Sequence, residues 1–454
     1  MKLIYGVNDK PKFGQLIIFA LQQLLAIMTA TLVVPVVINQ ACGTTMSSAA
    51  ALFGAGLGTL IYIAFTQKKS PVFLGSSFAF IGSMIAAFAG GVSMSLGYLG
   101  LIIGAMFAAL VYVVIAIIVK FAGVKWIEKI MPTVVIGPTV AIIGLSLAGN
   151  AIGDILKGSV PDVVASPLIT CLCGIVTLII TILCSTYGKK TAKLIPFIIG
   201  ILGGYLLSAI FTVIGNAANI DALKVLNFKP FTDLVANGVS LNTFFSVPDF
   251  TFLTAFKGFG ELNASYVSTI AVAYIPVAFV VFAEHIADHK NISSIIETDL
   301  LENPGLHRTL LGDGVGSIVG AIFGGCPNTT YGESVGCVAI TRNASVLTIM
   351  GAAILAILIS FISPFIAFVN SIPSCVMGGV CMALYGFIAV SGLKMIQNVN
   401  LNLNKNLFVV STILIAGIGG LTLSFGKITI TSIACALILG IIVNLLLSKA
   451  SDEE

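Results

Sequence analysis

The chain has 454 residues, of which 58% are hydrophobic and only 9% are charged. Soluble domains carry about 25% charged residues, so this composition excludes a soluble globular protein and indicates one that crosses a membrane many times. The net charge of +4 comes from basic residues in the loops, which orient the chain in the bilayer. It therefore does not indicate a nucleic-acid partner.

Apolar stretches of about 17–25 residues, the length that crosses a bilayer, follow one another along the whole chain. The first has no cleavage site of the signal-peptide type and is expected to be retained. The only long polar connection is 215–265. Fourteen spans are predicted, at 13–38, 47–66, 72–91, 98–122, 131–149, 166–186, 193–214, 266–288, 308–325, 327–342, 344–369, 372–392, 406–425 and 428–448.

The basic residues favour one orientation. With both termini in the cytoplasm, 5 of the 22 Lys and Arg residues lie in outer loops and the rest lie in inner loops. Such an excess of positive charge inside is typical of plasma-membrane proteins with many spans. The five outer residues are Lys157, Lys224, Lys229, Lys257 and Lys427.

Short matches between the two halves of the chain predict an internal repeat. They recur in the same order along both halves, and because each half has seven spans, the second half must be inserted upside down. The fold class is therefore an all-α polytopic membrane protein of two inverted seven-span repeats. The matched pairs are 56–59 with 314–317, 71–75 with 327–332, and 132–137 with 373–378.

The third span of each half is interrupted by Pro and Gly, in PVFLGSSFAF (71–80) and PNTTYGE (327–333). Extended backbone inside a membrane must line a cavity or pair with other backbone. We expect the two stretches to face each other as short antiparallel strands in spans 3 and 10, with helices after them whose N-termini point at a ligand. The alternative is that they are kinks that only assist packing.

Two glutamates, Glu284 and Glu333, lie where a bilayer makes charge expensive, which marks a functional site. Glu284 and Asp288 share one helix face, and His285 and His289 share a neighbouring face. A glutamate buried in apolar surroundings can alternate between a proton and a substrate donor, as proton coupling requires. The alternatives are carboxylates bonded to nearby hydroxyls, an interfacial Asp288, and histidines that only pack.

Two other classes of protein are open on these motifs. The run 285–289 (HIADH) comes close to a zinc signature on a helix, which would indicate an intramembrane metallohydrolase. The interrupted stretches 71–80 and 327–333 could also form the filter of a channel.

The chain resembles the nucleobase–ascorbate transporters, also called nucleobase:cation symporters, and within them the uracil permeases. The resemblance covers nearly the whole chain. It implies a transporter that uses no cofactor and no metal. Its most specific stretches are GSSFAFI (75–81), FAEH (282–285), NPGLHR (303–308), PNTTYGE (327–333) and AITR (339–342).

The resemblance implies a core domain (1–125 and 231–370) that carries the substrate and a gate domain (126–230 and 371–454) that lines the other side. It implies a homodimer through the gate domain. It also implies that Glu284 and Glu333 contact the base, that the backbone at Phe78 and Gly332 completes the hydrogen bonds, and that Ala30 and Tyr331 lie nearby.

Two positions depart from the family pattern. Ser334 stands where the family has Asn, which removes an amide contact, and Asp288 stands where uracil permeases often have His and purine members have Asp. Glu333 favours uracil, because purine members usually carry Gln there. We therefore predict a plasma-membrane uracil importer coupled to protons through Glu284, Asp288 and His289, with a xanthine or purine permease as the alternative. Sodium is the alternative ion, since Asp288 and the hydroxyls of Ser76, Ser77 and Thr329 could hold it.

Overall fold

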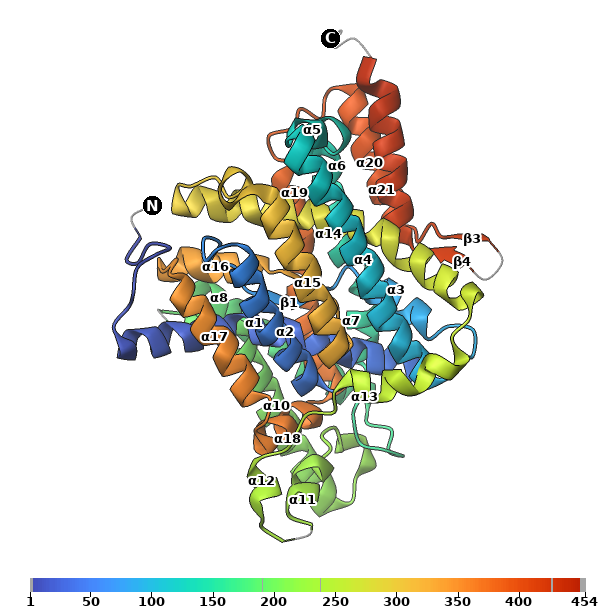
Figure 1. Ribbon diagram of the computed structural model, residues 1–454. Helices are drawn as coiled ribbons and strands as arrows, with labels where there is room; N and C mark the ends of the chain where they lie inside the picture. Colours follow the sequence, from blue (N-terminus) through green and yellow to red (C-terminus); the bar gives the residue numbers. More distant parts are fainter. Residues whose placement is uncertain (1–2, 190, 237, 426–427, 450–454) are drawn as a thin grey trace.

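The computed structural model describes residues 3–189, 191–236, 238–425 and 428–449 (Figure 1). Within these ranges the fold is almost entirely helical, and eight helices are long and apolar enough to cross a membrane, which confirms the all-helical membrane class. They are α1 (Phe13–Cys42), α2 (Ser48–Phe65), α4 (Met94–Ala122), α6–α7 (Thr133–Ser146 and Ala148–Ile155), α8 (Pro167–Tyr187), α10 (Pro196–Ala218), α14 (Ala264–Ile296) and α19 (Ser374–Met395).

Shorter helices complete the apolar stretches, so that each stretch predicted to cross the membrane contains helix. They are α3 (Ile81–Ala87), α15 (Leu306–Gly324), α16 (Gly332–Thr341), α17 (Val346–Ile359), α18 (Ser363–Ser371), α20 (Asn404–Ile418) and α21 (Ser432–Leu446). The connections hold α5 (Lys125–Ile130), α9 (Thr191–Leu194), η1 (Asp221–Leu223), α11 (Lys229–Val235), α12 (Leu241–Phe244), α13 (Thr251–Ala255), η2 (Phe256–Glu261), η3 (Leu301–Gly305) and η4 (Leu447–Lys449). The long polar connection 215–265 is thus partly helical.

The two interrupted stretches meet inside the molecule as an antiparallel strand pair (Figure 1). Strand β1 (Leu74–Ser76) pairs with β2 (Asn328–Thr330), with Gly75 opposite Thr329. Helix α3 follows the first strand and α16 follows the second. The predicted ladder and the helices after it are confirmed, and the interpretation of these stretches as simple kinks is wrong.

Side chains from neighbouring helices complete the hydrogen bonds of this short sheet. The Leu74 N–H donates to Thr59 Oγ1 on α2 (2.9 Å), and Asn328 Nδ2 donates to the carbonyls of Gly54 on α2 and Gly316 on α15 (3.1 Å each). Because lipid offers no hydrogen bonds, extended backbone at this depth needs such partners. The sheet is therefore fixed between α2 and α15.

Glycines allow helices from the two halves of the chain to pack backbone against backbone. A Cβ atom added to Gly58 would lie 2.9 Å from the Gly316 oxygen, and one added to Gly316 would lie 3.2 Å from the Gly58 oxygen. Likewise, a Cβ on Gly137 of α6 would lie 2.9 Å from the oxygen of Gly392 on α19. Any larger residue at these places would separate the helices.

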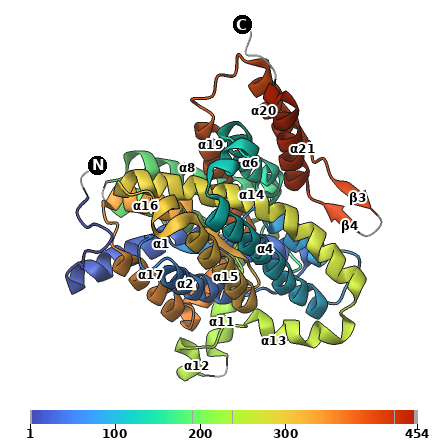
Figure 2. The same cartoon turned by 45° about the horizontal axis from the view of Figure 1, so that its top comes forward.

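The last two predicted spans have wrong boundaries. Helix α20 ends at Ile418, and the chain then forms a hairpin of β3 (Leu423–Phe425) and β4 (Ile428–Ile430) before α21 begins (Figure 2). The physical reason is the pair Gly419–Gly420, at which Gly420 adopts φ 73°, a left-handed conformation that ends a helix. The predicted inner residues Lys2 and Lys190 and the predicted outer residue Lys427 lie outside the described residues.

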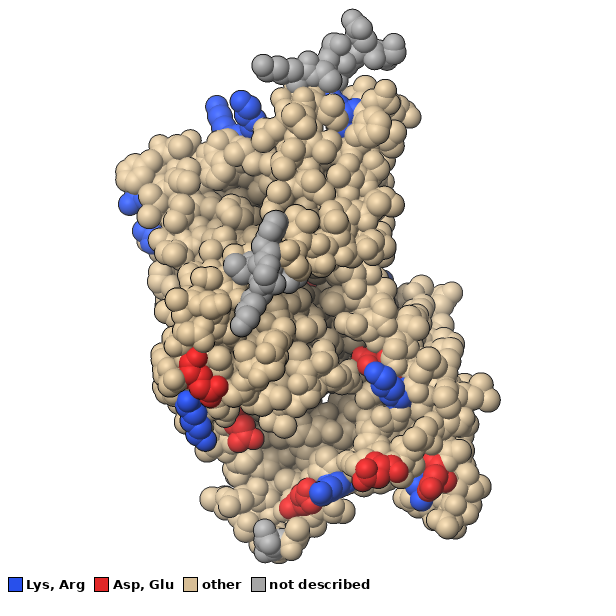
Figure 3. All heavy atoms as spheres, turned by 90° about the vertical axis from the view of Figure 1, so that its right-hand side faces the viewer, with Lys and Arg blue, Asp and Glu red and all other residues tan. Residues whose placement is uncertain are grey.

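The outer surface is suited to lipid. Figure 3 shows a broad area without charged side chains, which lies between basic residues near the top of the view and charged residues of both signs in its lower half. On α4 the exposed apolar residues recur every three or four positions, whereas small residues and Tyr112 on its other face are buried. This helix therefore turns one face to lipid and the other to the protein. The exposed residues are Met106, Leu110, Val113, Val114, Ile117, Ile118 and Phe121.

Candidate functional site

The predicted acidic residues gather where α14 passes the strand pair and the start of α16. Glu284 and Asp288 come from α14, and Glu333 lies in the first turn of α16. The Thr330 hydroxyl at the end of β2 donates to Asp288 Oδ2 (2.9 Å). A Cβ atom added to Gly332 would lie 3.5 Å from Asp288 Oδ1, so the start of α16 is close to α14.

Glu284 and Glu333 are each only partly buried, and Gly332 is exposed, although the residues around them are buried. Glu284 lies within electrostatic range of both Asp288 and Glu333. Within the described ranges, no protein group donates a hydrogen bond to the Glu284 carboxylate. A ligand at this position can therefore supply a donor to the Glu284 carboxylate.

Tyr331 lies between β2 and α16, and Ala30 lies in α1. The Tyr331 hydroxyl donates to the Ser76 carbonyl (2.7 Å), and its ring covers Gly75, where any side chain would collide with it. Ala30 and Tyr331 are both buried. The ring therefore fixes how the end of β1 presents its backbone to the site.

Phe78 connects the site to another part of the molecule. It lies between β1 and α3, and its ring packs edge-on against Tyr385 of α19, with centroids 5.7 Å apart and an interplanar angle of 79°. Such edge-to-face contacts are favourable between aromatic rings. Phe78 thus stands between the strand pair and a helix of the predicted gate domain.

The four groups predicted for sodium are not all brought together. The hydroxyls of Ser76, Ser77 and Thr329 are buried without a hydrogen-bond partner among the described residues. Neighbouring residues of a strand face opposite sides, so Thr329 points away from the face on which Thr330 contacts Asp288. Asp288 and Thr329 are therefore not arranged as ligands of one ion.

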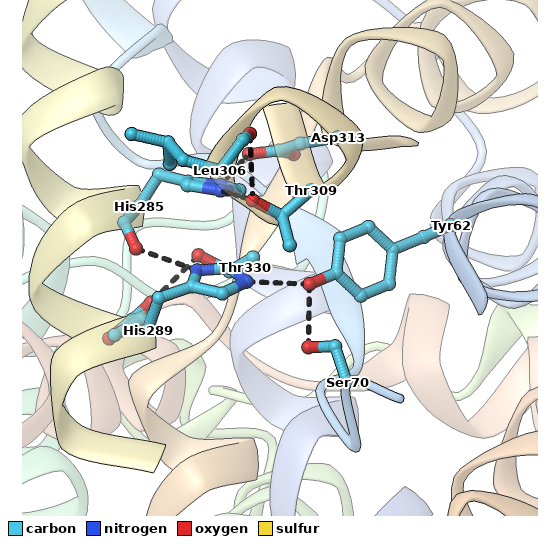
Figure 4. A network of polar contacts seen from close by, with 9 residues as sticks. Tyr62, Ser70, His285, His289, Leu306, Thr309, Asp313 and Thr330 are labelled. Atoms are coloured by element: carbon cyan, nitrogen blue, oxygen red, sulfur yellow. Dashed lines mark hydrogen bonds and ion pairs between the residues drawn. The ribbon is translucent and has the colours of Figure 1, made fainter. Parts of the chain in front are cut away.

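The two histidines of α14 form part of a buried polar network (Figure 4). His285 contacts Asp313 Oδ2 through Nδ1 (2.7 Å) and Thr309 Oγ1 through Nε2 (3.0 Å). Both partners come from α15. His285 therefore ties α14 to α15 deep in the protein, where all three side chains are inaccessible to solvent.

His289 ties α14 to α2 in the same network (Figure 4). Its Nδ1 contacts the His285 carbonyl (2.8 Å), and its Nε2 contacts the Tyr62 hydroxyl (2.7 Å), which also contacts Ser70 Oγ (2.7 Å). Because a carbonyl only accepts, Nδ1 carries the proton and the neutral Nε2 accepts from Tyr62. Neither nitrogen contacts Glu284 or Asp288.

These contacts use every ring nitrogen of the pair that suggested a zinc signature. Among the described residues, no group of three or more His, Cys, Asp or Glu side chains has an arrangement that could hold a metal ion. The two histidines therefore do more than pack, because their ring nitrogens hydrogen-bond α14 to α15 and α2.

Several residues of the network were not predicted from the sequence. Asp313 lies in the apolar stretch 308–325, which is the same signal that singled out Glu284 and could have found it. Tyr62, Thr309 and Thr330 give no such signal, because single hydroxyl groups are common in membrane helices.

Ser334, which stands where the family has Asn, is hydrogen-bonded to another helix. Gln23 of α1 donates through Nε2 to Ser334 Oγ (2.6 Å), which also accepts from the Phe73 N–H at the entry to β1 (3.0 Å). All three residues are buried. The side chain of Ser334 therefore joins α1, β1 and α16.

Known proteins resemble this chain over nearly its whole length. Residues 14–425 match the model of a family described as "Permease family". The chain is 38% identical over 461 residues to "Uracil permease" of Bacillus subtilis (strain 168), covering 100% of this chain and 97% of that protein. It is 34% identical over 455 residues to "Uracil permease" of Escherichia coli (strain K12), covering 99% and 96%.

A solved structure shares the fold. The transmembrane domain of a cyanobacterium bicarbonate transporter, BicA, superposes with a TM-score of 0.63 at 14% identity, covering 97% of this chain and 100% of that one. At this identity the likeness concerns the fold alone.

Proposed function

Because the chain belongs to this permease family, whose members transport rather than catalyse, we propose that it imports uracil together with protons. Membership confirms the resemblance to nucleobase permeases and overturns the zinc hydrolase. The observation that carries the proposal is the full-length relationship to uracil permeases, combined with the meeting of Glu284 and Glu333 beside the strand pair.

The chemistry of the site fits a pyrimidine base. Uracil presents ring N–H donors, which the carboxylates of Glu284 and Glu333 accept well. Its carbonyl oxygens can meet backbone N–H groups near Phe78 and at the start of α16, where Gly332 allows close approach. The flat faces of the base suit the ring of Phe78 and the small residue Ala30.

The transport movement would be a displacement of the core domain (1–125 and 231–370) against the gate domain (126–230 and 371–454). Two inverted repeats of seven spans, as the sequence predicts, would allow this movement. The reciprocal approach of Gly58 and Gly316, and the antiparallel pairing of β1 with β2, are the contacts that such a symmetry would produce. The excess of basic residues at the predicted inner loops supports cytoplasmic termini.

Proton coupling would centre on Glu284, whose carboxylate has no protein donor among the described residues. Asp288, held by Thr330, would adjust the charge that Glu284 experiences. His289 would act indirectly, because both of its ring nitrogens are used in the network with Tyr62.

One observation favours a second candidate, a xanthine or purine permease. Asp288, which purine members share, is fixed next to Gly332 at the binding position. Glu333 favours uracil, and competition between the two bases separates the candidates.

The test is uptake of labelled uracil into proteoliposomes, with and without an inward pH gradient and with an inward sodium gradient in its place. We expect uptake that follows the pH gradient and is not reduced by excess xanthine. Strong competition by xanthine would overturn the substrate, and uptake driven by the sodium gradient would overturn the coupling ion.

A further inference from the structure

A polar contact joins α1 to the α7–α19 pair, at a distance from the acidic site. Gln40, near the end of α1, reaches Asp154 in α7 and Ser374, the first residue of α19. The amide orientation that satisfies both partners places its nitrogen 3.0 and 2.8 Å from Asp154 Oδ1 and Oδ2 and its oxygen 3.2 Å from Ser374 Oγ. One side chain thus donates to a carboxylate and accepts from a hydroxyl.

The two partners of Gln40 belong to one rigid unit. Helices α7 and α19 pack backbone to backbone, because a Cβ atom added to Gly378 would lie 2.7 Å from the nitrogen of Ile155. The Ser374 N–H donates to Ser159 Oγ (2.9 Å), which fixes the start of α19. Asp154 is buried, with 7% of its surface exposed. Gln40 is the part of this contact that comes from the other proposed domain.

The contact can open, because Gln40 is exposed to solvent. A hollow of about 380 Å³ is lined in part by Asn39, which precedes Gln40 in the sequence, and by Asn370, four residues before Ser374. Hydrogen bonds to a carboxylate are nevertheless stronger than bonds between neutral groups. The hydrogen bonds of Gln40 therefore stabilise one arrangement of the two proposed domains and can still break when the domains move.

The same two proposed domains also contact each other at the candidate site. Tyr385, which packs against Phe78 at the candidate site, follows Ser374 by eleven residues on α19, or about 16 Å along the helix. An aromatic contact thus lies at the site, and the polar contact of Gln40 lies nearer the end of the helices. Any displacement of one domain against the other must break or slide both.

We propose that Gln40 and Asp154 are positioning residues that hold the outer end of the substrate site closed, so that uracil enters from outside only after their contact breaks. The side is set by Lys157, beside Asp154, which the proposed topology places outside. The inference rests on the proposed function for its substrate and its direction, and on the contact itself for its residues.

The variants Gln40→Ala and Asp154→Ala test this role. Losing the contact increases the outward-open fraction, so the apparent KM for external uracil falls, by up to about tenfold for one charge-assisted hydrogen bond. Asp154→Asn keeps one acceptor and should give an intermediate shift. The matched control is Gln397→Ala, which removes the same group from an exposed glutamine at the other end of α19.

A merely structural role would lower the maximal rate and leave the KM unchanged or raised, which would overturn the proposal. Additive effects of Gln40→Ala and Asp154→Ala on the KM would also overturn it, because partners in one contact must be non-additive.

A second measurement does not depend on the substrate. In Gln40→Ala, amide hydrogen exchange should accelerate in 151–160 and 374–380, and in Gln397→Ala it should not. If native protein does not transport uracil, the proposed function fails while this exchange experiment still tests the contact. Unchanged exchange in Gln40→Ala would contradict the contact itself.

Discussion

Replacing Thr330 by Val tests whether the strand pair positions the acidic site. The change keeps the shape of the side chain and removes the hydroxyl that donates to Asp288 Oδ2 at 2.9 Å. Thr330 is fully buried and Asp288 is 6% exposed, so water is poorly placed to restore the bond. Valine at this position therefore leaves a buried carboxylate oxygen without this donor.

The magnitude follows from the environment. Hydrogen bonds inside membrane proteins average about 0.6 kcal/mol and reach about 1.7 kcal/mol, and a carboxylate acceptor favours the upper end. We therefore expect Thr330→Val to lower the free energy of unfolding by about 1–2 kcal/mol. Because Gly332 lies next to Asp288, loosening this junction also displaces Glu333, and uracil affinity should fall by up to about tenfold.

The assays are thermal unfolding of the purified protein and binding of labelled uracil. Thr329→Val is the matched control, since it makes the same chemical change one residue earlier, where the hydroxyl is buried without a partner among the described residues. Removing an unpartnered hydroxyl should leave stability unchanged or slightly raised. Equal losses in the two variants, or none in Thr330→Val, would refute the reasoning.

Three further changes give separate expectations. Tyr62→Phe removes the donor to His289 Nε2 and should lower the free energy of unfolding, measured by thermal unfolding, by about 1 kcal/mol. Uracil selectivity should not change, and a change in selectivity would contradict the anchoring role. Gly75→Ala forces a methyl group into the ring of Tyr331, so uracil binding should be lost while the protein remains folded; unaltered binding would show that the ring does not position β1. Glu333→Gln should weaken uracil uptake and admit xanthine, and competition assays that show no gain of xanthine would contradict its role in specificity.

Much of the fold could be predicted because bilayer physics constrains it strongly. Apolar length located the helical segments, and the Pro and Gly residues of 71–80 and 327–333 located the two strands. The hairpin after α20 was not predicted, because the apolar residues of 421–425 and 428–430 extend the apolar stretches of α20 and α21. The pair Gly419–Gly420 marks the end of α20, but glycine pairs also occur inside membrane helices.

The site was only partly predictable for a different reason. Glu284 and Glu333 stand out because charge is rare in a membrane, and Asp313 carries the same signal. The partners of these acids are set by the rotation and packing of helices far apart in the chain, as with Thr330 and Asp288, which are separated by 42 residues. The hydrogen bond between Gln23 and Ser334 likewise becomes visible only when α1 lies beside α16.

The central claim is that uracil and protons enter together through Glu284. The most direct measurement is the internal pH of weakly buffered proteoliposomes, followed with a trapped dye while uracil is added outside without any imposed gradient. The account predicts internal acidification on addition of uracil to the native protein and none in Glu284→Gln. Uracil accumulation without acidification in the native protein, or equal acidification in Glu284→Gln, would contradict it.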